Sequence, residues 1–386
     1  MASYVPPALN NSLRTVEWMW QSNPNPFSES EPATWSHYSD LENLIIEKAF
    51  QDKQPRAQLD DYFIDFERSL QISNTDDYNQ RSIKRVVRRE ARFRDLPVSY
   101  KHSFGGEYGW VSPFVIEVRR DLKLEPDDLP SKKASLVPIL VEKAVQGIIE
   151  EGISIEKTCE AEKLADMLLK EKNAGIEEVW RCCAYLYTSE SFLYKTLNAA
   201  MRLVGDKEQE EVWRSKVRTL GPFCLLLWDD PFNTKVTTKK TLYRGATLTE
   251  EQIAAYAKMA KDDMDYGSFQ AYTSCSRNRD VAEQFGNTLF IMQVKFAFIA
   301  DLSPLSDFSA EEEELITPGV SFRVLSIKLD PTKILRDLLR DVDLYNLTDA
   351  DAVLLDDLLG FEGQCIRSGD INKEVRMVLL GGTGNG

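Results

Sequence analysis

Four consecutive glutamates, Glu311–Glu314, run directly into a short apolar segment that ends at a Pro-Gly break. If Leu315 enters a β-strand, residues two apart share a face, so Glu312 and Glu314 point the same way. Two carboxylates on one face repel each other, so one of them can handle the proton of an incoming nucleophile. The other can stabilise positive charge that develops on a substrate.

The register of this acidic run is ambiguous because its four side chains are identical. A shift by one residue would make the pair Glu311 and Glu313, whereas the expected strand boundary favours Glu312 and Glu314. A solvated acidic surface without any chemistry is the alternative for a charge block of this kind.

An arginine and a pair of serines precede the acidic run. Arg244 ends a short strand signal, and a planar guanidinium can hold phosphate oxygens through paired hydrogen bonds. Gly245 follows it and lets backbone groups approach a ligand closely. Ser274 and Ser276 stand two apart in a second strand signal, which leads into an amphipathic helical turn. By itself, the Arg-Gly pair would be a turn with a surface arginine.

In this order, Arg-Gly, Ser-X-Ser and Glu-X-Glu before an apolar strand resemble the R-S-E class of ADP-ribosyltransferases, the arginine-specific, cholera-toxin-like class. The resemblance covers roughly Ala134 to Asp330. It implies that NAD is the substrate, that no metal is needed, and that ADP-ribose moves to an arginine of an acceptor protein while nicotinamide leaves. The expected catalytic residues are Arg244, Ser274, Glu312 and Glu314.

The resemblance also implies how NAD is held. Arg244 would clamp the phosphates, and Gly245 would let the backbone approach the nicotinamide amide. Phe285, eleven positions after Ser274, would stack on the nicotinamide ring. The alternative for Phe285 is a helix residue that packs on the sheet.

The remaining roles concern the carboxylates. Glu314 would bond the ribose 2′-hydroxyl and stabilise positive charge at the anomeric carbon. Ser274 would orient Glu314, and Ser276 would support the same strand. Glu312 would hold the guanidinium of the acceptor, while Cys275, in place of a threonine, faces away from the cleft.

Two other functions stay open. In an NAD glycohydrolase water replaces the acceptor, and the sequence does not separate it from a transferase because both share the first half-reaction. The second alternative is a binding scaffold without catalytic activity. The presence of all the expected catalytic residues argues against it.

The N-terminal hundred residues carry a second pattern. Trp18 and Trp20 are followed by Trp35, by a helix with Asp40 as its expected N-cap, by an alternating strand from Tyr62 to Phe66, and by a basic segment. Over about Leu13 to Arg94 this pattern resembles a WWE domain, a module that binds the iso-ADP-ribose unit of poly(ADP-ribose).

The WWE resemblance implies a set of polymer-binding residues. Tyr62 would contact the adenosine, Gln71 would read its edge, and Arg81 would hold a phosphate. A further aromatic contact falls on Trp20, or on Met19, which would weaken it. The alternative is a protein-interaction module whose basic strand is a solvated face.

The composition limits what else the chain can do. Its 386 residues carry a net charge of -15, which argues against general binding to nucleic acid. The polar start of the chain contains no secretory apolar segment, and no run is long enough to span a bilayer. Six scattered cysteines suit a reducing compartment, and two histidines leave little room for a zinc site. We therefore expect an intracellular protein, cytoplasmic or nuclear, that is not secreted.

These patterns predict an α+β protein in four parts. Residues 1–95 form the WWE domain, a half-barrel sheet with one helix, and residues 96–133 are a bridging segment and linker. Residues 134–330 form a helical lobe followed by an ADP-ribosyltransferase mixed β-sandwich. Residues 331–386 are a C-terminal extension with two short helices over Pro331–Leu359 and a strand over Glu374–Leu380.

Overall fold

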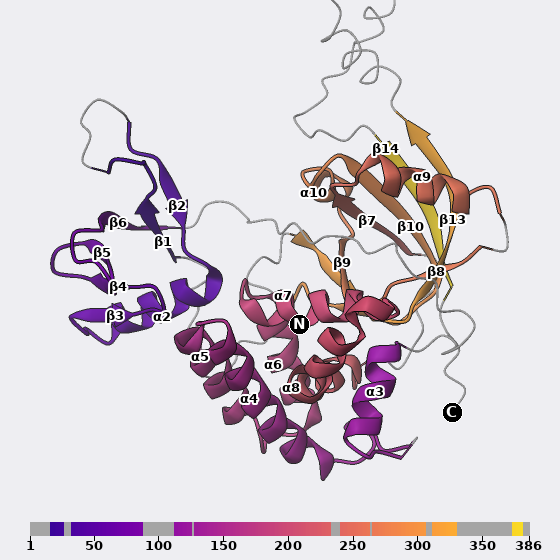
Figure 1. Ribbon diagram of the computed structural model, residues 1–386, viewed down its shortest axis with the longest axis horizontal. Coiled ribbons are helices and arrows are strands. Elements are labelled where there is room, and N and C mark those ends of the chain that lie inside the picture. The colour runs from indigo at the N-terminus through magenta and orange to yellow at the C-terminus, as the bar shows by residue number, and fades with distance from the viewer. Residues whose placement is uncertain are drawn as a thin grey trace, which may run out of the picture.

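The computed structural model describes residues 16–26, 32–87, 112–125, 127–232, 240–262, 265–305, 311–329 and 373–380. They form three parts: an N-terminal module, a helical lobe and a mixed-sheet domain (Figure 1). The predicted α+β class is confirmed. Among the helices of the described ranges, none is long and apolar enough to cross a bilayer.

The N-terminal module, residues 16–87, is an antiparallel sheet with one helix. In spatial order its strands are β2 (Trp35–His37), β1 (Val16–Gln21), β6 (Gln80–Val87), β5 (Leu70–Ser73), β4 (Tyr62–Asp65) and β3 (Arg56–Gln58), and its helix is α2 (Asp40–Gln51).

Helix α2 begins with a capping box. The Ser39 hydroxyl accepts from the Glu42 N–H, while the Glu42 carboxylate accepts from the Ser39 N–H at 2.9 Å. The N-cap is therefore Ser39, whereas the sequence analysis expected Asp40. On the inner face of the helix, Glu47 accepts a hydrogen bond from Trp18 Nε1 at 2.9 Å. This bond ties the helix to the sheet, so that the module is closed around one apolar core.

The helical lobe, residues 112–232, lies below the mixed sheet in Figure 1. Its helices are α3 (Pro113–Asp121), α4 (Leu136–Ser154), α5 (Thr158–Lys170), α6 (Ile176–Thr188), α7 (Phe192–Arg202) and α8 (Glu210–Trp228). The described part of the segment that we expected to be a bridge and linker contains a helix, α3. Phe114 and Val118 of α3 are buried in the core of the lobe, so α3 belongs to the lobe and not to a linker.

The N-terminal module is packed directly on the lobe. Leu41 and Leu44 of α2 are buried in the apolar core of the lobe. Asp60, in the turn before β4, accepts hydrogen bonds from the N–H groups of Cys159 at 2.7 Å and Glu160 at 3.3 Å. These amides belong to the first turn of α5, so a residue of the module caps a helix of the lobe.

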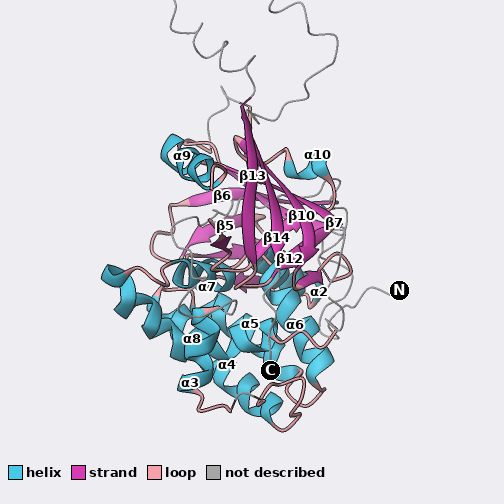
Figure 2. Cartoon of the chain, turned by 90° about the vertical axis from the view of Figure 1, so that its right-hand side faces the viewer, coloured by secondary structure: helices cyan, strands magenta, loops and turns pink. Residues whose placement is uncertain are grey.

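The mixed-sheet domain comprises the described residues from 240 onward. Its strands are ordered β11 (Ile299–Asp301), β12 (Glu313–Ile316), β9 (Thr273–Ser276), β7 (Lys240–Ala246), β10 (Thr288–Phe296), β14 (Lys373–Leu380), β13 (Ser321–Leu329) and β8 (Gly267–Ser268). Helices α9 (Glu250–Met259) and α10 (Arg279–Ala282) flank this sheet in Figure 2. Strands β10 and β14 are parallel, while the other described pairs are antiparallel.

The strand predicted at Glu374–Leu380 is confirmed as β14. It lies in the middle of the sheet, between β10 and β13. The mixed-sheet domain therefore extends past residue 330, where we expected a separate C-terminal extension to begin. The helices predicted over Pro331–Leu359 lie outside the described residues.

Candidate active site and ligand-binding face

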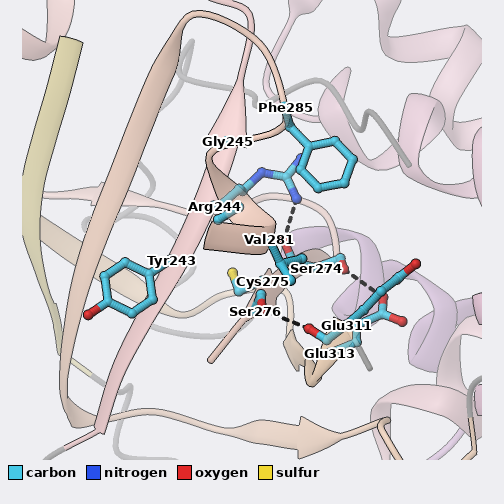
Figure 3. A pocket seen from close by; sticks show the side chains of 11 residues that line it. Tyr243, Arg244, Gly245, Ser274, Cys275, Ser276, Val281, Phe285, Glu311 and Glu313 are labelled. Carbon is cyan, nitrogen blue, oxygen red and sulfur yellow. Dashed lines mark hydrogen bonds between the residues drawn. The ribbon is translucent and has the colours of Figure 1, made fainter. Parts of the chain in front are cut away.

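A pocket opens where β7, β9, α10 and the acidic run meet (Figure 3). The empty space inside it, including the part open to solvent, is about 480 Å³. It is lined by Tyr243, Arg244, Gly245, Ser274, Cys275, Ser276, Val281, Ala282, Phe285, Glu311 and Glu313. The structure thus brings Arg244, Gly245, Ser274, Ser276 and Phe285 together, as the sequence predicts.

Arg244 lies near the end of β7, a strand with neighbours on both sides. It is buried, with 7% of its surface exposed. Its Nη1 donates a hydrogen bond to the backbone carbonyl of Ser274, drawn as a dashed line in Figure 3. A buried guanidinium fixed at the pocket wall is suited to binding an anion, because little conformational entropy is lost when the anion arrives.

Gly245 is required by a close approach of the backbone. A Cβ at this position would lie 2.1 Å from the carbonyl oxygen of Ala282 and 2.2 Å from that of Phe285. Both contacts are with backbone atoms, so the end of α10 would have to move to admit a side chain. The absence of a side chain at Gly245 therefore allows Phe285 to reach the pocket.

Two serines of β9 hold the acidic segment. Ser274 Oγ donates to Glu313 Oε1 at 2.6 Å, and Ser276 Oγ donates to the carbonyl oxygen of Glu311 at 2.7 Å. Glu311 and Glu313 are both nearly buried, at 8% and 5% exposure. The pocket therefore contains two carboxylates from one segment, together with Arg244.

The expectation that Glu312 and Glu314 face the pocket is wrong. Strand β12 begins at Glu313, and Glu312 before it has a positive φ of 48°, so its half-exposed side chain leaves the pocket. The carboxylates in the pocket are those of Glu311 and Glu313, the other register that the sequence left open. The Ser274 hydrogen bond expected for Glu314 is made to Glu313.

Glu314 points to the opposite face of β12. It is paired with Cys275 across the sheet, and Cys275 packs in the apolar core of the mixed-sheet domain, away from the helical lobe. The Glu314 carboxylate is 1% exposed and bonds to Lys240 Nζ and to Arg277 Nη1. Its negative charge is thus compensated by two cations behind the sheet.

The four residues predicted to bind a polymer gather on one face of the N-terminal sheet. Gln71 and Arg81 are directly opposite each other on β5 and β6. The Arg81 guanidinium lies 5.4 Å from the centre of the Trp20 ring, and its Nη1 donates to the carbonyl oxygens of Gln21 and Asn23. An aromatic ring beside an arginine and an amide suits a ligand with a base and phosphates.

The sequence analysis missed Tyr38 and Glu42, which hold two of the predicted residues in place. The Tyr38 hydroxyl donates to Gln71 Oε1 at 2.8 Å, and the Tyr62 hydroxyl donates to Glu42 Oε1 at 2.6 Å. Tyr38 therefore holds the Gln71 amide, and Glu42, which also completes the α2 cap, holds Tyr62. The capping signal Ser-X-X-Glu was present in the sequence and could have drawn attention to Glu42.

Comparison with known families gives two matches. Residues 177–338 match the model for NAD:arginine ADP-ribosyltransferases, and residues 16–85 match the model for the WWE domain. The chain combines a WWE domain with an ADP-ribosyltransferase domain. The pocket residues from Arg244 to Glu313 all lie within the first match, and the face formed by Trp20, Gln71 and Arg81 lies within the second.

Solved structures similar to the ADP-ribosyltransferase part come from bacteria. ADP-ribosyltransferase HopU1 of Pseudomonas syringae pv. Tomato is 15% identical, covers 53% of this chain and 77% of its own, and has a TM-score of 0.35. The Salmonella SpvB domain is 13% identical; the match covers 52% of this chain and 98% of that domain, with a TM-score of 0.33. Exoenzyme S from Pseudomonas aeruginosa was solved with human 14-3-3 protein beta and carba-NAD. It is 18% identical; the match covers 56% of this chain and 97% of that chain, with a TM-score of 0.32. A search of curated proteins found no match.

The helical lobe adds a second arginine to the ADP-ribosyltransferase domain. Arg202 ends α7, and burial lowers its pKa; the nearby positive charge of Arg244 lowers it further. The sequence analysis had not singled out Arg202, because an arginine at the end of a helix usually only complements the helix dipole. In the described part of the chain, no cluster of three or more metal-ligating side chains is found.

Proposed function

We propose that the protein is a mono-ADP-ribosyltransferase that moves ADP-ribose from NAD to an arginine side chain of a protein. The observation that supports this most is the pair Glu311 and Glu313, which enters one pocket together with Arg244 and Ser274. The pocket offers the Arg244 guanidinium for the pyrophosphate of NAD and two carboxylates for the positive charges of the reaction.

In the first step the bond between nicotinamide and ribose breaks, and nicotinamide leaves with the bonding electrons. Positive charge then develops at the anomeric carbon. Glu313, held by Ser274 at 2.6 Å, would accept a hydrogen bond from the ribose 2′-hydroxyl and stabilise that charge. Arg244 would hold a phosphate, and Phe285 would pack on the nicotinamide ring.

In the second step a guanidine nitrogen of the acceptor bonds to the anomeric carbon and loses its proton. Glu311 would attract the guanidinium and take that proton. An arginine acceptor fits a site with two carboxylates better than a neutral acceptor does, since its charge offsets theirs. This is the role that the sequence analysis had given to Glu312.

The WWE domain would bring the enzyme to chains of poly(ADP-ribose) inside the cell. Its Trp20, Tyr62, Gln71 and Arg81 lie on one face of the sheet, where a base and a phosphate could be bound together. Binding there would raise the effective concentration of acceptors on proteins that already carry the polymer.

The experiment is incubation of the full chain with labelled NAD, with and without agmatine as an arginine-like acceptor. We expect wild type to release nicotinamide and to label agmatine. Glu313→Gln should reduce both on the order of 10²-fold or more, because a transition-state contact is lost. Glu311→Gln should lose labelling of agmatine while retaining more of the nicotinamide release. The matched control is Glu312→Gln, which removes the same charge outside the pocket.

The other outcomes separate the alternatives. Nicotinamide release by wild type without label on any acceptor would indicate an NAD glycohydrolase. No release under any condition would leave a poly(ADP-ribose)-binding protein with a silent catalytic domain.

A further inference from the structure

The acidic run poses a problem of register. Four identical side chains cannot by themselves decide which two face the pocket, since a slip of one residue exchanges the two faces of a strand. Both directions of slip would still leave a glutamate beside Ser274. Something outside the run must therefore select Glu313 for this place.

The neighbours of the run disfavour both slips. If Glu314 moved to the place of Glu313, Leu315 would face the cations Lys240 and Arg277 and leave them without a carboxylate. If Glu312 moved there instead, Glu314 would take the place of Leu315, which is 1% exposed in the apolar core of the lobe. The first slip takes a carboxylate away from two partly buried cations, and the second buries a carboxylate without a partner; both are costly.

Of the two cations that pair with Glu314, Arg277 is the one that also contacts other segments. Its Nη1 donates to Glu314 Oε1 at 3.0 Å and to Asp301 Oδ2 at 3.0 Å, and its Nη2 donates to Ser303 Oγ at 3.0 Å. Its Nε lies 3.5 Å from Glu312 Oε2. One guanidinium thus connects the acidic run to β11 and to the turn that follows β11.

The backbone around Arg277 holds the same segment. The Arg277 N–H donates to the carbonyl oxygen of Glu312 at 3.2 Å, next to the bond from Ser276 to Glu311. From the other side, the Leu302 N–H donates to the carbonyl oxygen of Glu313 at 3.0 Å. These bonds also fix Glu312 in its left-handed conformation, which a non-glycine residue adopts only when its surroundings impose it.

We infer that Arg277 is a positioning residue, which selects the register of the acidic run by holding Glu314 behind the sheet and so keeps Glu313 against Ser274. Lys240 supports it from β7. The inference rests on the proposed function, because it assigns Arg277 a purpose only if Glu311 and Glu313 act in the pocket.

The test compares Arg277→Met, Arg277→Lys and the double variant Arg277→Met/Glu314→Leu in the full chain. Two readouts are taken: hydrogen–deuterium exchange of the peptide that contains residues 311–317, and the kcat and KM of nicotinamide release from NAD. Arg279→Met is the matched control, since Arg279 follows two residues later and pairs with Glu283 and Glu374 outside the pocket.

We expect Arg277→Met to accelerate exchange in this peptide and to lower kcat about tenfold or more, with KM for NAD changed less than about threefold. Arg277→Lys should recover part of kcat. The double variant should recover part of kcat and of the protection, because a leucine behind the sheet no longer needs the Arg277 cation, while Lys240, which is 28% exposed, can be solvated. If Arg277→Met does not fold, the lysine and double variants carry the test.

Protection and kcat equal to wild type in Arg277→Met would overturn the inference, and so would a double variant as impaired as the single one. A loss of kcat accompanied by an equal effect in Arg279→Met would mean only general destabilisation and would also refute it. Wild type without nicotinamide release would refute the proposed function instead, while the exchange data would still report on the register.

Discussion

The Ser274 hydroxyl donates a hydrogen bond of 2.6 Å to Glu313 across the pair of strands β9 and β12. Ser274 itself is opposite Leu315 in the register of this pair, so the bond runs diagonally to the first residue of β12. It fixes one carboxylate oxygen, and the other oxygen, Oε2, is buried without a hydrogen-bond partner. Such an oxygen is suited to accept a hydrogen bond from a ligand.

Replacement of this serine should therefore reduce the rate more than the binding of NAD. In Ser274→Ala the Glu313 carboxylate loses its fixed orientation, and we expect kcat to fall about tenfold or more with little change in KM. Steady-state kinetics of nicotinamide release checks this. The control is Ser326→Ala on β13, at the far side of the sheet, which should keep both constants.

The close approach at Gly245 gives a second prediction. In Gly245→Ala the new methyl group would meet the carbonyl oxygens of Ala282 and Phe285, so the end of α10 must move and carry Phe285 with it. We expect a higher KM for NAD and a melting temperature lower by several degrees.

Gly175→Ala serves as the control for Gly245→Ala. Gly175 has a φ of 103°, but a Cβ there would meet only a side-chain oxygen of Glu178, at an ordinary contact distance of 3.5 Å. This variant should lose about 1 kcal/mol of stability from backbone strain and keep its KM for NAD. An unchanged KM in Gly245→Ala would show that the α10 wall of the pocket does not contribute to NAD binding.

The face of the WWE domain formed by Trp20, Tyr62, Gln71 and Arg81 gives a third prediction. Arg81→Ala should weaken binding of poly(ADP-ribose) about tenfold or more, because a bidentate phosphate contact is lost. Turnover of NAD should stay the same. The control is Arg56→Ala on β3, which removes the same charge from an arginine that stacks on Phe63. Equal polymer binding by wild type and Arg81→Ala, measured by fluorescence polarisation, would remove the reader function.

Glu160 lies between the WWE domain and the helical lobe and is nearly buried. Burial raises the pKa of Glu160 to about 7, although the hydrogen bond from the Phe192 N–H and the charge of Lys157 work in the opposite direction. The neighbouring carboxylates of Glu42 and Asp60 raise it further. The folded protein therefore holds the Glu160 proton more tightly than the unfolded chain does.

Stability should depend on this proton. Since the folded-state pKa is above the unfolded value, the contribution of Glu160 is present in full below about pH 4.5 and is lost as the pH rises through about 7. A shift of this size corresponds to on the order of 3 kcal/mol. Glu160→Gln should thus be more stable than wild type at about pH 8 and similar to it at about pH 5. Urea unfolding at both values checks this; a constant difference would contradict it.

Parts of the fold could be predicted from short signals, and one of the errors had a signal that was overlooked. The alternation from Tyr62 and the apolar run at Glu374–Leu380 predicted β4 and β14. Helix α3 was missed although Ser112 and Pro113 form a helix start, with proline in the first turn. The position of β14 inside the sheet was out of reach, because pairing with a distant strand is not determined by the sequence of the strand itself.

The candidate site shows the same limit at the level of single residues. The order of Arg244, Ser274 and the acidic run was sufficient to predict the pocket. The identity of the carboxylates was not, because local alternation is the same in both registers of a glutamate run. The partners that decide between the registers, Lys240 and Arg277, are far from Glu314 in the sequence, and only the fold brings them together.

The cap that Asp60 supplies to α5 has a consequence for how the two domains can be separated. The first turn of α5 depends on a carboxylate nearly a hundred positions earlier in the chain, and Leu41 and Leu44 are shared with the core of the lobe. An ADP-ribosyltransferase part separated from the WWE domain would expose an apolar surface that is buried in the full chain, and helix α5 would lose its N-terminal cap. A different domain in place of the WWE domain would have to reproduce this contact with the helical lobe. The two parts of the chain are therefore expected to be inherited together.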